Sequence, residues 1–440
     1  MSALPELVAP WWSYNKAMVA AHNGADAVYL GVPFTSLRMR QNKVRDYKIL
    51  QQTIDDLHAL GTKAYLTMNI FPRNMDIKIF ESVLARVSEM WADAIIFSDP
   101  GTFRVIRKHM PNARLHLSTQ ANTLNHEAIS FWYDLGVERV VLARELTIKE
   151  IEQIKQKVPG MELEIFVHGA MCIAYSGRCL MGEYFSGRDG NKWECSHVCR
   201  YNFKVHLEEE KRPWRTFELW QDEDGTYLMS SKDLCTIERL WELLPYVDGL
   251  KIEWRSKSEL YVWAITKAYK HVRDSIVSGT PLDESTKNLV YQIPHRFYRD
   301  GFLFNSIRTA PDWEPLSTEE QEHLSDPANT GVTQTTPWPI AEVEYCGVIL
   351  QEDASDINTI AWRTFHTFVP KQKLYVGDRL QYFVGDTRWE LTITWLSLDG
   401  ETLCDAITSN MEHWWIETDK ALLWREVLYR ELAQPTAEQE

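Results

Sequence analysis

Four of the chain's seven cysteines, Cys172, Cys179, Cys195 and Cys199, lie in one short polar segment. Thiolate sulfur binds both zinc and iron–sulfur clusters, and four thiolates suit either. Zinc knuckles usually pair ligands a few residues apart, as Cys195 and Cys199 are, but Cys172 and Cys179 are further apart. The residues alone allow either zinc or an iron–sulfur cluster. Cys235 is a possible substitute ligand that could replace Cys199.

The composition predicts an ordered, soluble, cytoplasmic protein. Disulfides do not persist in a reducing compartment, and an odd cysteine count fits reduced thiols. The opening residues MSALPELVAPWW lack the features of a signal peptide, and no apolar run approaches the ~20 residues of a membrane span. A formal charge of −15 argues against loose, charge-driven binding of nucleic acid, but not against a shaped site with local basic residues.

Apolar strands alternate with amphipathic helices through the first part of the chain, and this pattern predicts a parallel sheet covered on both faces. Eight such strands indicate an α/β fold, a TIM-type and possibly distorted barrel. Only the connection before the last strand is long, and it carries the cysteine cluster to the carboxyl-terminal mouth, where barrel enzymes keep their chemistry. The predicted strands are 7–9, 27–30, 64–68, 94–98, 115–118, 140–143, 163–167 and 250–253.

The rest of the chain predicts three further parts after the barrel of residues 1–255. Residues 256–324 read as a helical extension that wraps the barrel, and residues 325–339 as a polar linker. Residues 340–440 alternate in period 2 with Gly-Asp turns, which indicates a small C-terminal β-barrel domain. We expect this domain to end in a helix over residues 421–432.

Polar side chains at predicted strand ends are the candidate catalytic residues, namely His168, Gln120, Asn122 and Arg144. An imidazole can serve as general acid or base, and amides can orient a ligand through paired donor and acceptor contacts. The alternatives are that His168 hydrogen-bonds a cluster sulfur, that the amides form a structural network, and that Arg144 pairs with Glu145.

Cations at the same end of the barrel are the candidate substrate-binding residues, together with Asn69 at the third strand. Arg38 and Arg40 belong to a basic loop after the second strand, which suits phosphate contacts unless it is merely solvated. Lys251 has an internal ion pair with Glu253 as its alternative. The full set is Arg38, Arg40, Asn69, Arg178, Arg188, Lys232, Lys251 and Arg255.

The string EIFVHGAMCIAYSGRCLMG around the first two cysteines closely resembles the signature of the collagenase-like peptidase family. STQAN at 118–122, GADAVYLG at 24–31, SKDL at 231–234 and LKIE at 250–253 extend the resemblance over nearly the whole chain. It implies a 4Fe–4S cluster on the four cysteines and an oxygen-independent hydroxylation in which prephenate supplies the hydroxyl. The branch that the β-rich tail resembles implies tRNA as partner and 5-hydroxyuridine at the wobble position as product.

Other relatives in this family hydroxylate ribosomal RNA or quinone precursors, and these remain alternatives. A protease receives little support, because the chain has no GxSxG elbow, HExxH helix or aspartic dyad signature. Tryptophans stand where the family has smaller residues, at Trp11, Trp12, Trp193 and Trp254. They either form a stacking platform for a base or fill an unused pocket, as in a non-catalytic partner of a homologous, active protein.

Overall fold

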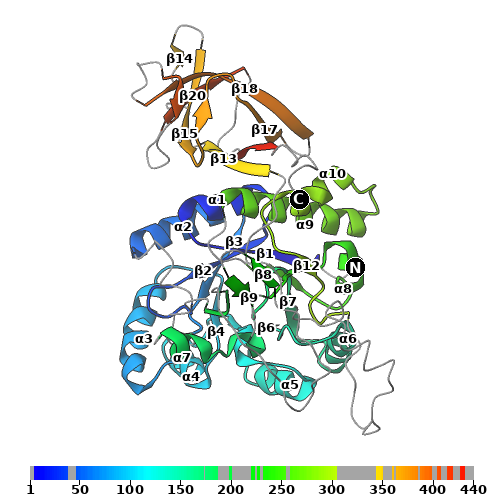
Figure 1. Cartoon of the computed structure of the whole chain (residues 1–440). Coiled ribbons are helices and arrows are strands. Elements are labelled where there is room, and N and C mark those ends of the chain that lie inside the picture. Colours follow the sequence, from blue (N-terminus) through cyan, green and yellow to red (C-terminus); the bar gives the residue numbers. More distant parts are fainter. Residues whose placement is uncertain are drawn as a thin grey trace, which may run out of the picture.

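The computed structural model shows a strand barrel surrounded by helices, and a smaller β-rich domain beside it (Figure 1). No helix in the described part of the chain is both long enough and apolar enough to cross a bilayer. The described residues are 4–37, 46–172, 174–186, 198–200, 220–222, 225–227, 231–253, 258–304, 343–349, 359–360, 363–384, 387–398, 404–407, 414–419 and 427–431.

Eight parallel strands form the barrel, and the predicted TIM-type fold is confirmed. Each strand pairs with the next along the chain, and the last pairs with both β7 and β1, which closes the barrel. The strands are β1 (Glu6–Pro10), β2 (Ala27–Gly31), β3 (Lys63–Thr67), β4 (Ala94–Phe97), β5 (Leu115–Leu117), β6 (Arg139–Val141), β7 (Glu162–Ala170) and β11 (Gly249–Ile252).

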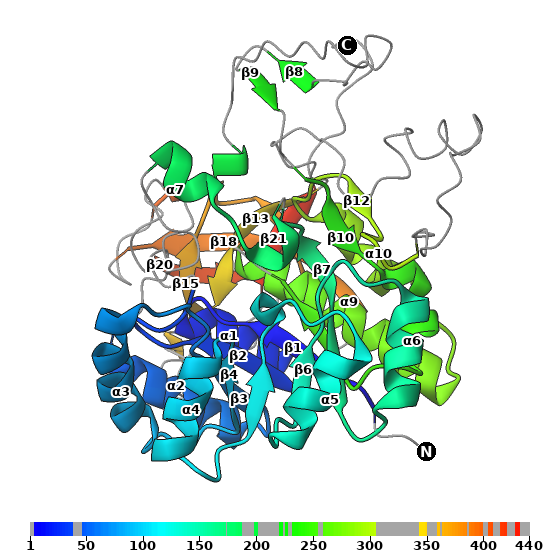
Figure 2. The same ribbon diagram turned by 90° about the horizontal axis from the view of Figure 1, so that it is seen from below.

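Helices between the strands cover the outside of the barrel (Figure 2). Asp99, Asn125 and Thr147 each accept a hydrogen bond from a backbone N–H in the first turn of the helix that follows. The main apolar core lies between these helices and the strands. The helices are α1 (Tyr14–His22), α2 (Tyr47–Ala59), α3 (Asn74–Val87), α4 (Pro100–His109), α5 (His126–Asp134), α6 (Ile148–Lys157), α7 (Met181–Ser186), α8 (Leu240–Leu243), α9 (Glu259–Ser278) and α10 (Glu284–Gln292).

The barrel interior holds a buried network of charges. The fully buried Glu164 on β7 accepts from Arg139 Nη1 of β6 at 3.1 Å and from Lys251 Nζ of β11 at 2.6 Å. Arg139 also pairs with Glu6 of β1, with 2.7 Å between Nη1 and Oε2. Lys251 thus pairs with Glu164 on the neighbouring strand, whereas the sequence suggested Glu253 as its partner. The network joins the four strands that meet where the barrel closes.

The pKa of Glu6 shows how strongly the network favours the ionised form of its side chains. Burial disfavours the ionised carboxylate, but the Arg139 guanidinium and hydrogen bonds from Lys63 and Tyr65 lower the pKa of Glu6 to about 2. Burial also opposes the Arg139 charge, yet Glu164 and Glu6 raise the pKa of Arg139 above its ordinary value. Glu6 and Arg139 are therefore both charged around neutral pH.

Further strands on either side of β11 in the sequence lie outside the barrel. β10 (Asp233–Cys235) runs antiparallel to β7, and β12 (Tyr298–Arg299), which lies in the part predicted as a helical extension, pairs with β10. β8 (Trp220–Asp222) and β9 (Gly225–Tyr227) form a separate hairpin. The predicted linker at 325–339 lies outside the described residues.

The C-terminal domain is an antiparallel sheet in which β13 pairs with both β21 and β15, so that six strands form a closed ring. Its own apolar core lies inside this ring. The strands are β13 (Val343–Ile349), β14 (Thr359–Ile360), β15 (Arg363–Pro370), β16 (Leu374–Tyr375), β17 (Arg379–Val384), β18 (Thr387–Ser397), β19 (Ala406–Ile407), β20 (Trp414–Thr418) and β21 (Val427–Glu431).

The helix predicted at 421–432 is wrong in its second half, where β21 lies. Leu428 enters the core of the C-terminal domain, while Val427 and Tyr429 belong to the core cluster of the barrel. Tyr429 packs against Trp263 of α9 with ring centroids 5.6 Å apart. Two apolar faces in period 2 require a strand, and this tertiary packing outweighs local helix propensity.

Replacing Glu164 tests the network. Glu164→Gln leaves Arg139 and Lys251 buried with one counter-charge fewer, so we expect the free energy of unfolding to fall by about 3 kcal/mol. The control is Glu138→Gln, which breaks an exposed pair with Arg114 at 2.7 Å and should cost less than about 1 kcal/mol. Urea titration followed by tryptophan fluorescence measures both. Equal, small losses would contradict a stabilising network.

Candidate functional site at the barrel mouth

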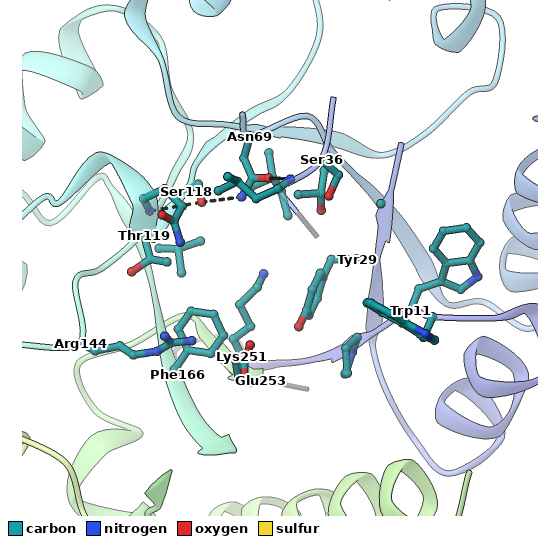
Figure 3. A pocket seen from close by; sticks show the side chains of 18 residues that line it. Trp11, Tyr29, Ser36, Asn69, Ser118, Thr119, Arg144, Phe166, Lys251 and Glu253 are labelled. Atoms are coloured by element: carbon teal, nitrogen blue, oxygen red, sulfur yellow. Dashed lines mark hydrogen bonds between the residues drawn. The ribbon is translucent and has the colours of Figure 1, made fainter. Parts of the chain in front are cut away.

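A pocket opens at the carboxyl ends of the barrel strands, with about 800 Å³ of space including the part open to solvent. Figure 3 shows its side chains converging from strands on all sides of the barrel. They are Pro10, Trp11, Trp12, Tyr29, Gly31, Ser36, Leu37, Thr67, Asn69, Ile96, Ser118, Thr119, Gln120, Val141, Arg144, Phe166, Lys251 and Glu253.

Two cations and two aromatic rings form one side of the pocket. The Arg144 guanidinium lies over the Phe166 ring, with its central carbon 3.9 Å from the ring centroid. Lys251 Nζ lies 4.2 Å from the centroid of the Tyr29 ring, whose hydroxyl donates to the Ile252 carbonyl at 3.0 Å. Cations stacked on aromatic faces are held without losing their ability to bind an anion. This side therefore suits a ligand that carries a carboxylate or phosphate.

Amide and hydroxyl groups form another part of the wall. Asn69 accepts from the Leu37 backbone N–H at 3.2 Å and donates to Ser118 Oγ at 3.2 Å, so both ends of its amide serve the structure. Gln120 is also buried, but its side-chain carbonyl oxygen has no hydrogen-bond partner among the described residues, and neither does the Thr67 hydroxyl. A buried polar atom left this way costs free energy unless a ligand or water satisfies it.

The structure places the predicted residues in three groups. Gln120, Arg144, Asn69 and Lys251 line the pocket, as do Trp11 and Trp12. Asn122, Arg178, His168 and Lys232 are described but do not line it. The predicted residues outside the described part of the chain are Arg38, Arg40, Arg188, Arg255, Cys195, Trp193 and Trp254.

His168 is fully buried away from the pocket wall, against α9 and β12. Its Nδ1 lies 3.3 Å from the Tyr269 hydroxyl, and its Nε2 lies 3.3 Å from the Tyr298 hydroxyl. The pairing of β7 with β11 shifts its register just before His168: Phe166 lies opposite Lys251, but His168 lies opposite Ile252, so Val167 is an extra residue in β7. The extra residue breaks the alternation of inward-facing and outward-facing side chains, which explains why His168 faces the outer packing layer.

Asn122 and Arg178 hold the segment after β7 against the rim of the pocket. Asn122 Nδ2 donates to the backbone carbonyl of Tyr175 at 3.3 Å, and Arg178 Nε donates to the backbone carbonyl of Gln120 at 3.4 Å. Ser176 bonds the Glu145 carboxylate through its backbone N–H at 2.5 Å and through its hydroxyl. Glu145 thus anchors this segment, where the sequence suggested a pair with Arg144.

Three of the four clustered cysteines are described, and all three are half-buried. Cys172 follows β7, Cys179 precedes α7, and Cys199 lies in a short 3-10 helix that contacts α7. Within the described ranges, no three Cys, His, Asp or Glu side chains come together around a possible metal. The thiols suit an iron–sulfur group by their chemistry and partial exposure, and the fourth member of the set, Cys195, lies outside these ranges.

Cys235 does not fit the role of substitute ligand. It is buried on β10, and burial raises the pKa of its thiol to about 12, with the Tyr269 hydroxyl 3.8 Å away. A metal ligand must be a thiolate, and this environment opposes ionisation.

Sequence reasoning missed Tyr29, Thr67, Phe166 and Glu164. Tyr29 and Thr67 lie on strands that were predicted, and extending the inward-facing period-2 positions of each strand would have found them. Glu164 stands in an apolar strand, where a lone carboxylate signals a buried ionic partner.

Replacing Gln120 separates binding from stability. Gln120→Leu removes a buried acceptor that has no hydrogen-bond partner among the described residues, so we expect the free energy of unfolding to rise by about 1 kcal/mol. We also expect a loss of activity, because the amide can then no longer bind a ligand. Asn69→Leu is the matched control, because both ends of its amide are bonded, and it should lose stability. Chemical unfolding of both variants measures the difference. A destabilised Gln120→Leu protein would show that the amide serves the structure.

Comparison with known proteins places the chain in a family. The chain is 39% identical over 337 residues to the tRNA hydroxylation protein P of Escherichia coli (strain K12), covering 68% of this chain and 74% of that protein. It is 38% identical over 340 residues to the tRNA hydroxylation protein P of Haemophilus influenzae (strain ATCC 51907 / DSM 11121 / KW20 / Rd), with the same coverage. The 23S rRNA 5-hydroxycytidine C2501 synthase of Escherichia coli (strain K12) is 31% identical over 273 residues, covering 62% of this chain and 40% of that protein.

The family model described as Peptidase family U32 matches residues 12–310, which include the barrel strands from β2 to β11 and the helices α9 and α10. The resemblance that the motifs indicated is thereby confirmed: the chain belongs to peptidase family U32.

Proposed function

We propose that this protein is an RNA-modifying enzyme that hydroxylates tRNA. The observation that carries the proposal is the 39% identity to a tRNA hydroxylation protein over 337 residues, which covers 68% of this chain. The aromatic wall formed by Trp11, Trp12 and Tyr29 supports it, because base–aromatic stacking contributes about 1–3 kcal/mol per base. The product we propose is 5-hydroxyuridine at the wobble position.

The proposed cofactor is a 4Fe–4S cluster held by Cys172, Cys179, Cys195 and Cys199. Such a cluster would supply electron transfer. The proposed hydroxyl donor is prephenate, which carries two carboxylates. Arg144 and Lys251 support this choice, because they bring positive charge to one side of the pocket. The residues of the chain would bind and orient the donor and exclude water from it.

A second candidate is hydroxylation of ribosomal RNA, which the 31% identity to a 23S rRNA 5-hydroxycytidine synthase favours. The quinone-precursor and non-catalytic alternatives have no comparable observation behind them. Proteolysis through His168 and Cys172 is disfavoured, since both ring nitrogens of His168 lie within 3.3 Å of tyrosine hydroxyls.

The first test is nucleoside analysis by mass spectrometry in a strain that lacks tRNA hydroxylation. Expression of this protein should restore 5-hydroxyuridine in tRNA, and an Arg144→Gln variant should restore much less. An exposed-site variant, Arg114→Gln, is the control and should behave as the wild type. Hydroxylated cytidine in ribosomal RNA instead would favour the second candidate, and no change in either RNA would sink both.

The second test is metal analysis of protein purified without oxygen. We expect near-equal iron and labile sulfide and a visible absorbance that dithionite bleaches. Cys172→Ser should lower the iron content, while Cys404→Ser in the C-terminal domain should leave it unchanged. A colourless protein that holds one zinc, even after cluster reconstitution, would contradict the proposed cofactor.

A further inference from the structure

Lys251 is a buried amine that reaches into the pocket. It lies near the carboxyl end of β11, is 4% exposed, and lines the pocket together with Arg144 and Glu253. In Figure 3 its side chain extends toward the middle of the cavity, between Tyr29 and the stacked pair of Arg144 and Phe166. A ligand in the pocket would therefore meet the nitrogen of Lys251.

The surroundings of Lys251 weaken its hold on a proton. Burial lowers its pKa, and although Glu164 acts in the opposite direction, the charges of Arg139 and Arg144 add to the lowering. An amine in such an environment is neutral more often than an exposed one, and the neutral amine is the nucleophile.

Glu164 is placed to carry the proton. Its Oε1 lies 2.6 Å from Lys251 Nζ, and its Oε2 is held by Arg139 Nη1 at 3.1 Å. Arg139 fixes the carboxylate, so the oxygen that faces Lys251 keeps its position. A general base within hydrogen-bond reach of an amine both takes and returns a proton during attack on a carbonyl.

We propose that Lys251 forms an imine with a 2-oxo acid bound in the pocket, with Glu164 as its proton carrier and Arg144 as the anchor for the acid's carboxylate. The nitrogen lone pair attacks the ketone carbon, and a proton passes through Glu164 from nitrogen to the former carbonyl oxygen. Loss of water from the resulting carbinolamine leaves the C=N bond. No electrons enter or leave, so the step needs no oxidant or reductant.

This inference deepens the proposed function, because it rests on a donor that carries a ketone beside a carboxylate. The competing explanation is that Lys251 is a permanent cation that only neutralises Glu164. The two differ in one property, which is whether a covalent bond to carbon can form at Nζ.

Reductive trapping tests the proposal. The full-length protein is incubated with pyruvate and sodium cyanoborohydride, which reduces an imine to a stable secondary amine, and the modified lysines are located by peptide mass spectrometry. Lys270 is the internal reference, because its Nζ also pairs with a carboxylate at 2.6 Å, on Asp274, but on the exposed surface of α9. We expect labelling of Lys251 to exceed that of Lys270 by about tenfold or more, because the lowered pKa of Lys251 favours the neutral, nucleophilic amine.

Two variants complete the test. Lys251→Arg keeps a cation beside Glu164 but cannot form an imine, so it should remove the labelled peptide, whereas Lys270→Arg should leave labelling of Lys251 intact. Labelling of Lys251 no greater than that of Lys270 in the wild-type protein would overturn the proposal, whether or not Lys251→Arg folds.

Because trapping needs no tRNA, the two proposals fail separately. Trapping without tRNA hydroxylation would remove the proposed function and keep the imine-forming lysine. Hydroxylation without trapping would remove only the lysine chemistry.

Discussion

The buried carboxylate of Glu164 is the contact on which the barrel and its pocket both depend. It binds a cation on each neighbouring strand, Arg139 of β6 and Lys251 of β11. The second of these pairs spans the junction where the last strand closes the barrel. A buried charge is tolerable only while its partners stay in place, so the network fixes the register of the closing strand. It also fixes the floor of the pocket, because Lys251 belongs to both.

Much of the barrel could be predicted from the sequence, because a strand covered on both faces must be nearly continuous in apolar residues. The interior ion pairs could not be predicted. Glu164 becomes the partner of Lys251 only when the fold makes two strands that are distant in the sequence into neighbours. The same limit explains the C-terminal end. The pattern around Leu428 suits a helix locally, and only the two apolar surfaces on either side of β21 decide for a strand.

The candidate site was predictable where function follows from position at a strand end. Gln120, Arg144 and Lys251 follow directly from strand boundaries, and all three line the pocket. The same rule gave the wrong position for His168, because the register shift between β7 and β11 inserts Val167 and reverses the direction of the side chain that follows it. An extra residue in one strand of a pair is not visible in a single sequence. The role proposed for the cysteines rests on their chemistry and on the family resemblance.

The order of strands along the chain also determines the order in which the protein can assemble. β11 pairs with β1 at one edge and β7 at the other, so the barrel stays open until residues 249–252 have left the ribosome. By then all four clustered cysteines have been synthesised, because they precede β11. Closing the long connection between Ala170 and Gly249 costs only slightly more chain entropy than closing a shorter connection would. During translation, the four thiols therefore leave the ribosome before the barrel can close.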